Sequence, residues 1–384
     1  MMRTLAASFL VAAALPMAVA QNQALQTTIG IDGGVEFPFD ARMVPPTGIT
    51  VEAWITYDDS TIPTGFYYWP TIARQNITPN QESWNFRVSA SNNNSRNLQF
   101  IVRTASNQLF AATYTFAAGE FANWTHVAGS WDGQVIRLFK NGAQVATFTT
   151  PLSEVQNNGG LLRLANGDPI APGREAWNGR LDEIRVWPMA RTAGEIAATR
   201  DLALTHMPGQ VLVFPLDGTF TSEDGTVVGT PFGTTSFVTG TPSTTATFAL
   251  LFENGAQTSN CARKPTLLTG SLATLGNSSF TLWCVRGPLP SASPAAIVGA
   301  ASATAPPGQP QVFGVDIALD LSTLLATATL VPATDALGNA RFTLPIPTNL
   351  GLLGASAVFQ FAFVDAACGP QGYTASGGLT FAIQ

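Results

Sequence analysis

Residues 123–148 read NWTHVAGSWDGQVIRLFKNGAQVATF, and this stretch decides the fold. Two dipeptides interrupt it, Asp132-Gly133 and Asn141-Gly142. Asp-Gly and Asn-Gly tolerate positive φ at the central positions of a tight turn, so they close two-residue hairpins with the twist that β-strands need. The stretch therefore predicts three short antiparallel strands joined by two tight turns.

The same pattern of alternating apolar residues recurs upstream. Three sets alternate with polar neighbours: Ile49, Val51, Ala53 and Ile55; Trp84, Phe86 and Val88; and Leu98, Phe100 and Val102. Strands of this kind, separated by clusters of Gly, Pro and Asn, are typical of a two-sheet β-sandwich. A capping-box pattern, Thr192 with Glu195, predicts one short helix that runs to about Arg200.

Charge is scarce and unevenly distributed along the chain. Charged residues make up 11% of its 384 residues, the net charge is −6, and no basic stripe occurs. We therefore expect neither nucleic acid nor an anionic membrane surface as a partner. Residues 21–244 hold 32 charged side chains and residues 245–384 hold nine. A stretch rich in Thr, Gly, Pro and Ser separates the two parts, so we predict one domain over 25–240 and a second, smaller β-sandwich over 245–384.

Residues 1–20 have the pattern of a secretory signal peptide. A short basic start precedes the apolar run from Leu5 to Leu15, and Ala18-Val19-Ala20 is a small-x-small cleavage site. We expect cleavage near Ala20 and a secreted, extracellular or cell-surface protein; the alternative is an uncleaved membrane anchor. No later segment is apolar for long enough to predict a membrane span.

The cysteines are Cys261, Cys284 and Cys368. In an oxidising compartment one disulfide is expected, with three pairings to choose from and one thiol left over. We favour Cys261 with Cys284, because the segment between them reads as adjoining strands.

Several motifs, in their order along the chain, resemble the laminin-G-like, concanavalin A-type jelly roll. They are IGIDGGVEFPFD with GITVEAWI, then WTHVAGSWDG, the IRLFKNGAQVATF hairpin, and GRLDEIRVWPMARTAGEIAA. The resemblance covers roughly residues 25–240. It implies a two-sheet antiparallel sandwich of a class that mostly binds carbohydrate or protein, and in which some members hydrolyse glycosides.

Asp182 is the candidate metal ligand. Strict alternation along residues 181–187 places it on the face of Ile184 and Val186, where an unpaired carboxylate would need amide donors, an arginine or a cation. The resemblance implies a structural calcium held by the aspartate of this closing strand. The alternatives are that Asp182 caps loop amides or pairs with Arg180.

Catalysis is not expected, because the E-x-D-x-E pattern that places paired carboxylates on one strand face in the glucanases of the resembled fold is absent. The better candidates for binding are aromatic: Tyr67, Tyr68 and Trp69, with Arg74 close by as a planar donor. The alternative is that alternate members of this aromatic run pack into a sheet. We therefore expect a non-enzymatic protein that binds carbohydrate or a surface protein through loops at one rim of the sandwich. The other hypotheses are a structural envelope or matrix component and a glycoside hydrolase.

Overall fold

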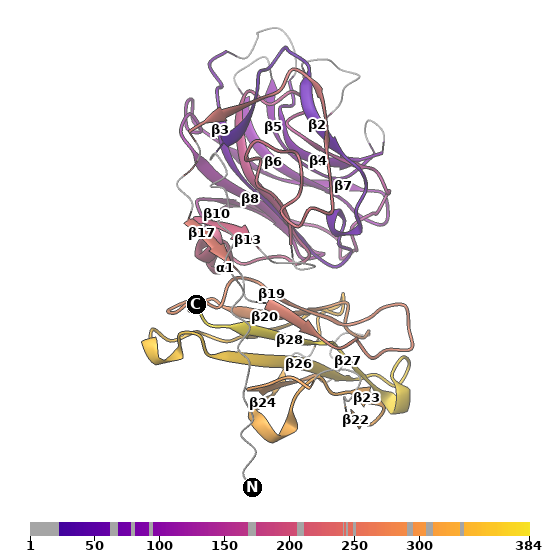
Figure 1. Ribbon diagram of the computed structural model, residues 1–384. Coiled ribbons are helices and arrows are strands. Elements are labelled where there is room, and N and C mark those ends of the chain that lie inside the picture. Colours follow the sequence, from indigo (N-terminus) through magenta and orange to yellow (C-terminus); the bar gives the residue numbers. More distant parts are fainter. Residues whose placement is uncertain are drawn as a thin grey trace.

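The computed structural model describes residues 23–61, 68–77, 81–91, 95–167, 174–205, 211–240, 242, 245–248, 251–289, 295–304, 310–330 and 334–384. They form two β-rich units, residues 23–240 and 251–384, with the short helix α1 (Ala193–Thr199) lying between them (Figure 1). Among these residues, no helix is long and apolar enough to cross a membrane. The predicted signal peptide, residues 1–20, lies outside the described residues.

Two facing antiparallel sheets make up the first unit. The eight-stranded sheet contains, in spatial order, β10 (Ala143–Thr149), β9 (Val135–Lys140), β8 (Thr125–Trp131), β3 (Ile49–Tyr57), β12 (Gly179–Trp187), β1 (Gln23–Thr27) and β16 (Ser236–Thr239), with β14 (Leu212–Phe214) also paired to β12. The seven-stranded sheet contains β15 (Thr230–Gly233), β2 (Gly33–Phe37), β11 (Leu161–Leu164), β4 (Thr71–Asn76), β5 (Glu82–Ser91), β6 (Ser95–Arg103) and β7 (Leu109–Thr115). This is the predicted two-sheet sandwich.

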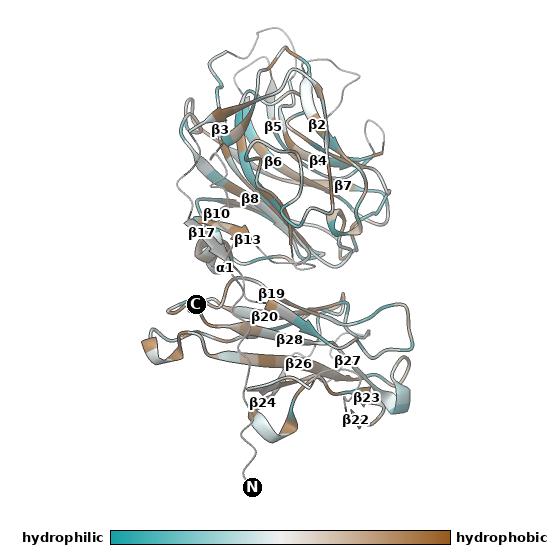
Figure 2. Cartoon of the chain, viewed as in Figure 1, coloured by the Kyte–Doolittle hydropathy of each residue, from teal (hydrophilic) through white to brown (hydrophobic). Residues whose placement is uncertain are grey.

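Alternation of side chains along these strands builds the core between the sheets. The predicted apolar sets of β3, β5 and β6 are all buried in one cluster, together with Val127, Trp131, Ile136 and Leu138 of the hairpin strands. Their polar neighbours point to the outer faces, and Figure 2 shows hydrophobic and hydrophilic residues interspersed along the strands of this unit. The two turns lie where predicted, with φ of 91° at Gly133, 50° at Asn141 and 80° at Gly142.

The second unit is also built of β-strands, in smaller sheets. Its six-stranded sheet contains β18 (Leu251–Asn254), β28 (Gly378–Ala382), β26 (Ser356–Val364), β21 (Ala295–Ala300), β24 (Leu324–Leu330) and β27 (Tyr373–Ala375). Five further strands are β19 (Thr266–Thr269), β20 (Thr281–Val285) and β25 (Ala340–Thr343), which pair together, and the pair β22 (Gln311–Val312) and β23 (Val315–Asp316). Single-turn 3-10 helices occur at Ala41–Met43, Leu321–Thr323, Leu350–Leu352 and Pro370–Gly372.

The disulfide joins Cys261 to Cys368, so the predicted pairing of Cys261 with Cys284 is wrong. Cys284 lies within β20 and its side chain is fully buried in the core of the second unit. Cys261 lies half-buried in the segment before β19. The assumption that neighbouring strands would bring the two thiols together failed because Cys284 points inward.

Contacts between the two units are extensive. Trp187 and Met189 from the first unit and Leu268 and Val285 from the second belong to one buried apolar cluster. In addition, β13 (Leu202–Thr205) pairs in parallel with β17 (Thr245–Phe248), at the point where the chain passes between the units. The domain limits given above, 25–240 and 245–384, remain a prediction.

Candidate functional site

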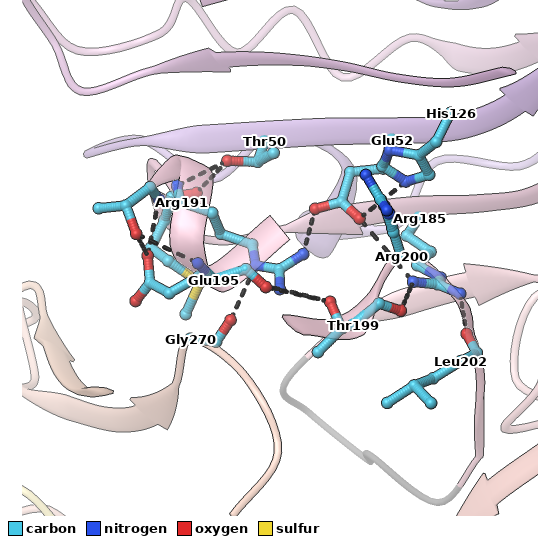
Figure 3. A network of polar contacts seen from close by, with 12 residues as sticks. Thr50, Glu52, His126, Arg185, Arg191, Glu195, Thr199, Arg200, Leu202 and Gly270 are labelled. Atoms are coloured by element: carbon cyan, nitrogen blue, oxygen red, sulfur yellow. Dashed lines mark hydrogen bonds and ion pairs between the residues drawn. The ribbon is translucent and has the colours of Figure 1, made fainter. Parts of the chain in front are cut away.

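The outer face of the eight-stranded sheet carries a buried network of polar side chains around Glu52 of β3 (Figure 3). Arg191 and Arg185 both pair with this carboxylate, and all three side chains are fully buried. The Nε2 atom of His126, on β8, lies 3.6 Å from the Oε2 atom of Glu52. Burial alone would raise the pKa of Glu52, but Arg191, His126 and Arg185 outweigh it and lower that pKa to about 2.

This network also contacts α1 and the second unit. Arg185 donates to the carbonyl of Thr199 at 3.0 Å, and Arg191 Nε donates to the carbonyl of Gly270 at 2.8 Å. Both arginines are therefore paired with Glu52, whereas the two ring nitrogens of His126 lack a hydrogen-bond partner among the described residues. The centre of this sheet face is covered by α1 and by the second unit. The second cavity-bearing surface of the sandwich is the outer face of the other sheet.

The outer face of the seven-stranded sheet carries a row of side chains from neighbouring strands. Arg74 of β4 lies opposite Asn85 of β5, which lies opposite Ile101 of β6, which in turn lies opposite Ala111 of β7. Cross-strand partners project to the same side of a sheet. Because Trp84 and Phe86 fill the core, Asn85 between them must point to the outer face.

A cavity of about 410 Å³ lies over this row, and Trp69, Arg74 and Glu175 line it. Arg74 is bound on both sides: its Nη1 is 2.9 Å from Glu175 Oε2, and its Nη2 is 3.3 Å from Glu82 Oε2. Its side chain is only 4% exposed. Arg74 therefore shapes the cavity floor, and its charge is already compensated by protein carboxylates.

Three further polar side chains lie on the same face: Asn85, Arg87 and Gln99. Asn85 is fully buried, and neither its amide nitrogen nor its amide oxygen has a hydrogen-bond partner. Arg87 donates through Nε to Gln99 at 3.4 Å, and Gln99 donates to Thr113 at 3.3 Å. Burial lowers the pKa of the Arg87 guanidinium from its ordinary value. Arg87 and Gln99 both line the cavity, so they present polar groups to whatever occupies it, whereas Asn85 is covered and does not line it.

Of the four predicted ligand contacts, Trp69 and Arg74 meet at this cavity. Trp69 is half-buried, and its backbone N–H donates to the carbonyl of Arg174 at 2.9 Å. Tyr68 is 8% exposed and packs into the core, so its predicted role as a surface contact is wrong. Successive residues of an extended segment point to opposite sides, which sends Tyr68 inward and Trp69 outward. Tyr67 lies outside the described residues.

Sequence analysis missed Asn85, Arg87 and Gln99. A signal for them was present, because each alternates with a core residue that had been identified: Asn85 and Arg87 flank Phe86, and Gln99 precedes Phe100. Three polar residues on the outward side of two neighbouring strands mark a polar sheet face. The cavity bordered by Trp69 lies on the sheet face, and the rim-loop site stays a prediction.

Asp182 lies elsewhere, at a β-bulge in β12. The pairing with β3 shifts between Asp182 and Arg185, and Glu183 within the bulge has φ of 48°. Asp182 consequently lies opposite Trp54 on the outer face, whereas Ile184 belongs to the core. The prediction that Asp182 shares the face of Ile184 and Val186 is therefore wrong, because the extra residue of the bulge reverses the alternation.

The surroundings of Asp182 fit a calcium ion only in part. Burial, followed by repulsion from Glu183 and Asp217, raises the pKa of Asp182 to about 9, and a cation would relieve that repulsion. Its Oδ1 accepts a hydrogen bond from the backbone N–H of Glu183 at 2.9 Å, as the amide-capping alternative predicted. Within the described part of the chain, no group of three or more His, Cys, Asp or Glu side chains could hold a metal ion. A calcium at Asp182 would therefore need carbonyl or water oxygens as further ligands.

Comparison with known proteins identifies the sandwich. Residues 30–197 match the family model of the concanavalin A-like lectin/glucanases superfamily. This segment is a concanavalin A-like domain. Both the seven-stranded sheet face described above and the Glu52 network belong to it. A search of curated proteins finds no match to the chain.

Several solved structures are similar to part of the chain, at low sequence identity and low TM-score. A protein from Bacteroides ovatus assigned as carbohydrate-binding is 19% identical over 55% of this chain and 61% of that chain, with a TM-score of 0.40. The SAP-like pentraxin of Limulus polyphemus is 15% identical over 55% of this chain and 96% of its own, with a TM-score of 0.35. The CBM40 domain of the Ruminococcus gnavus IT-sialidase, solved with α2,3-sialyllactose, is 14% identical over 45% of this chain and 96% of its own, with a TM-score of 0.33.

Proposed function

We propose that this is a secreted binding protein whose concanavalin A-like domain holds an oligosaccharide on the outer face of the seven-stranded sheet. The observation that carries the proposal is a cavity on this face that Trp69 borders and that Arg87 and Gln99 line with hydrogen-bonding groups. An indole ring stacks on the C–H face of a sugar, and amide and guanidinium groups bind its hydroxyls. The cavity volume falls within the usual range for small-molecule sites, about 300 to 1,000 Å³.

Binding without hydrolysis is part of the proposal. The two carboxylates at the cavity, Glu82 and Glu175, both contact the guanidinium of Arg74. That guanidinium lies between them, where the scissile bond of a glycoside would have to lie for a paired acid and nucleophile. Release of reducing sugar ends from a polysaccharide by the purified protein, lost on Glu175→Gln, would contradict this part.

The test is a glycan array followed by calorimetry on the best oligosaccharide. We expect Trp69→Ala to weaken binding at least about tenfold, which corresponds to about 1.4 kcal/mol. Gln99→Leu should have a similar effect, because an apolar side chain of comparable size cannot bind a hydroxyl. Phe39→Ala, which removes an exposed aromatic outside the cavity lining, is the matched control and should bind as the parent does. No binding to any array member, or equal binding by Trp69→Ala, would contradict the proposal.

A structural role in an envelope or matrix is the second candidate. It is favoured by apolar side chains exposed on the second unit, with Leu350 at 77%, Leu353 at 61% and Phe313 at 60%. Few charges oppose association there. Concentration-dependent assembly of the full chain that is lost on Leu350→Lys would support this role.

A further inference from the structure

A second cavity, of about 770 Å³, lies between the two units. One wall comes from β9 and β10 of the concanavalin A-like domain, with Arg137 and Gln144, and the other comes from β20 and β25 of the second unit. Residues 189–193, which lead into α1, complete the lining. The cavity is distinct in its residues from the one on the seven-stranded sheet.

The two walls of this interdomain cleft are tied together by direct contacts. Asn339 Nδ2 donates to the carbonyl of Thr47 at 3.0 Å, and Arg263 pairs with Glu154 at 3.1 Å. The Asp132-Gly133 turn also meets the second unit closely, since a Cβ on Gly133 would lie 2.1 Å from Leu337. The cleft is therefore preformed, and a ligand would not have to bring the units together.

Arg341 is the cation of the cleft without a carboxylate partner. It lies opposite Trp283 in the β20–β25 pair, and its guanidinium carbon is 5.5 Å from the centroid of the indole ring. Arg137 by contrast pairs with Asp132 at 2.7 Å, and Arg191 pairs with Glu52. No carboxylate among the described residues pairs with Arg341, which is exposed.

Amide groups supply the neutral part of the lining. Gln144 is exposed at the cleft on β10. Asn339 is 93% buried (7% exposed), and its side-chain oxygen has no hydrogen-bond donor. An exposed amide, an acceptor that lacks a donor and a half-buried indole suit a ligand rich in hydroxyls better than an apolar side chain.

We propose that the interdomain cleft binds a carboxylate-bearing saccharide, with Arg341 pairing to the carboxylate and Gln144 and Asn339 contacting hydroxyls. A guanidinium binds a carboxylate through two parallel hydrogen bonds, and the cation–π contact with Trp283 holds Arg341 at the cleft wall. The acidic sugar can be a hexuronate or a sialic acid, which share this group. The proposal does not depend on the oligosaccharide site of the seven-stranded sheet.

The experiment uses the full chain and calorimetry with uronate-containing and sialylated oligosaccharides, each beside its counterpart with the carboxyl reduced to the alcohol. At least one acidic member should bind about tenfold or more tightly than its reduced counterpart. Arg341→Ala should abolish that preference, and Gln144→Trp, which fills the cleft from an exposed position, should abolish binding there. Lys264→Ala, which removes an exposed positive charge of the second unit outside the cleft, is the matched control.

Trp69→Ala separates the two sites, because it should leave the preference for acidic sugars intact. The proposal is overturned if no acidic sugar is preferred, if Arg341→Ala retains the preference, or if Trp69→Ala removes it. Binding of an acidic peptide that depends on Arg341, without binding of any acidic sugar, would assign the cleft to a protein partner and also overturn it.

Discussion

At the scale of single residues, Asp182 links stability to pH. Its folded pKa of about 9 lies above the ordinary value of 3.8, so the folded state binds the proton more tightly than the unfolded state does. The contribution of Asp182 to stability is complete below about pH 4 and is lost as the pH rises toward 9. In EDTA, Asp182→Asn should therefore flatten the fall in Tm between about pH 5 and pH 9. Thermal scans of both proteins across that range provide the measurement.

The same variant tests for calcium. If a calcium ion binds at Asp182, EDTA should lower the Tm of the parent at neutral pH by several degrees. The difference in Tm between calcium and EDTA should increase with the free calcium concentration. Asp182→Asn should then melt at the same temperature with calcium and with EDTA. Asp201→Asn, at a half-exposed carboxylate, serves as the control. Equal melting of the parent in both conditions would exclude a stabilising calcium.

At the scale of elements, α1 connects the two units through one carboxylate. Thr192 and Glu195 form a reciprocal capping box at the start of the helix. Glu195 Oε1 also accepts hydrogen bonds from Thr281 Oγ1 and, at 2.8 Å, from Trp283 Nε1, both of the second unit. The helix is thus both capped locally and bound to the second unit, although it has only seven residues.

The two roles of the capping box predict different losses on substitution. Thr192→Ala removes a cap and should lower the free energy of unfolding by about 1 kcal/mol. Glu195→Ala also leaves the buried Thr281 hydroxyl and the half-buried Trp283 indole without an acceptor, and a buried unpaired donor costs about 1 to 3 kcal/mol, so the loss should exceed that of Thr192→Ala by at least about 1 kcal/mol. Urea unfolding followed by tryptophan fluorescence measures both, with Thr192→Ser as the conservative control. Equal losses for Thr192→Ala and Glu195→Ala would show that the contacts of Glu195 with the second unit contribute nothing.

At the scale of the whole molecule, the disulfide restricts the second unit. Cys261 and Cys368 are 107 residues apart in sequence, so the bond closes most of that unit into a loop. Cys261→Ser with Cys368→Ser should destabilise the second unit by about 2 to 5 kcal/mol, because the unfolded chain regains the freedom of a long loop. Calorimetry should show the transition of the second unit at a lower temperature. Cys284→Ala, which removes the buried free thiol, should leave the disulfide and its effect in place.

Local sequence rules were sufficient to predict the structure wherever residues close together in the chain determine it. Turn dipeptides determined the β8–β9–β10 hairpins, alternation determined the core faces of β3, β5 and β6, and the capping box determined α1. Each of these signals depends on φ preference or on the two-residue period of a strand, and both are properties of a short segment. The concanavalin A-like sandwich over residues 30–197 could therefore be predicted from the sequence.

Tertiary structure alone decided which groups meet. The bulge at Glu183 turned Asp182 to the other face, and the inward direction of Cys284 left Cys368 as the partner of Cys261. The cavity that brings Arg74 to Glu175, and the cleft that both Arg341 and Gln144 line, unite residues far apart in the chain. Such encounters depend on strand register and on the packing of the two units, which no local pattern encodes.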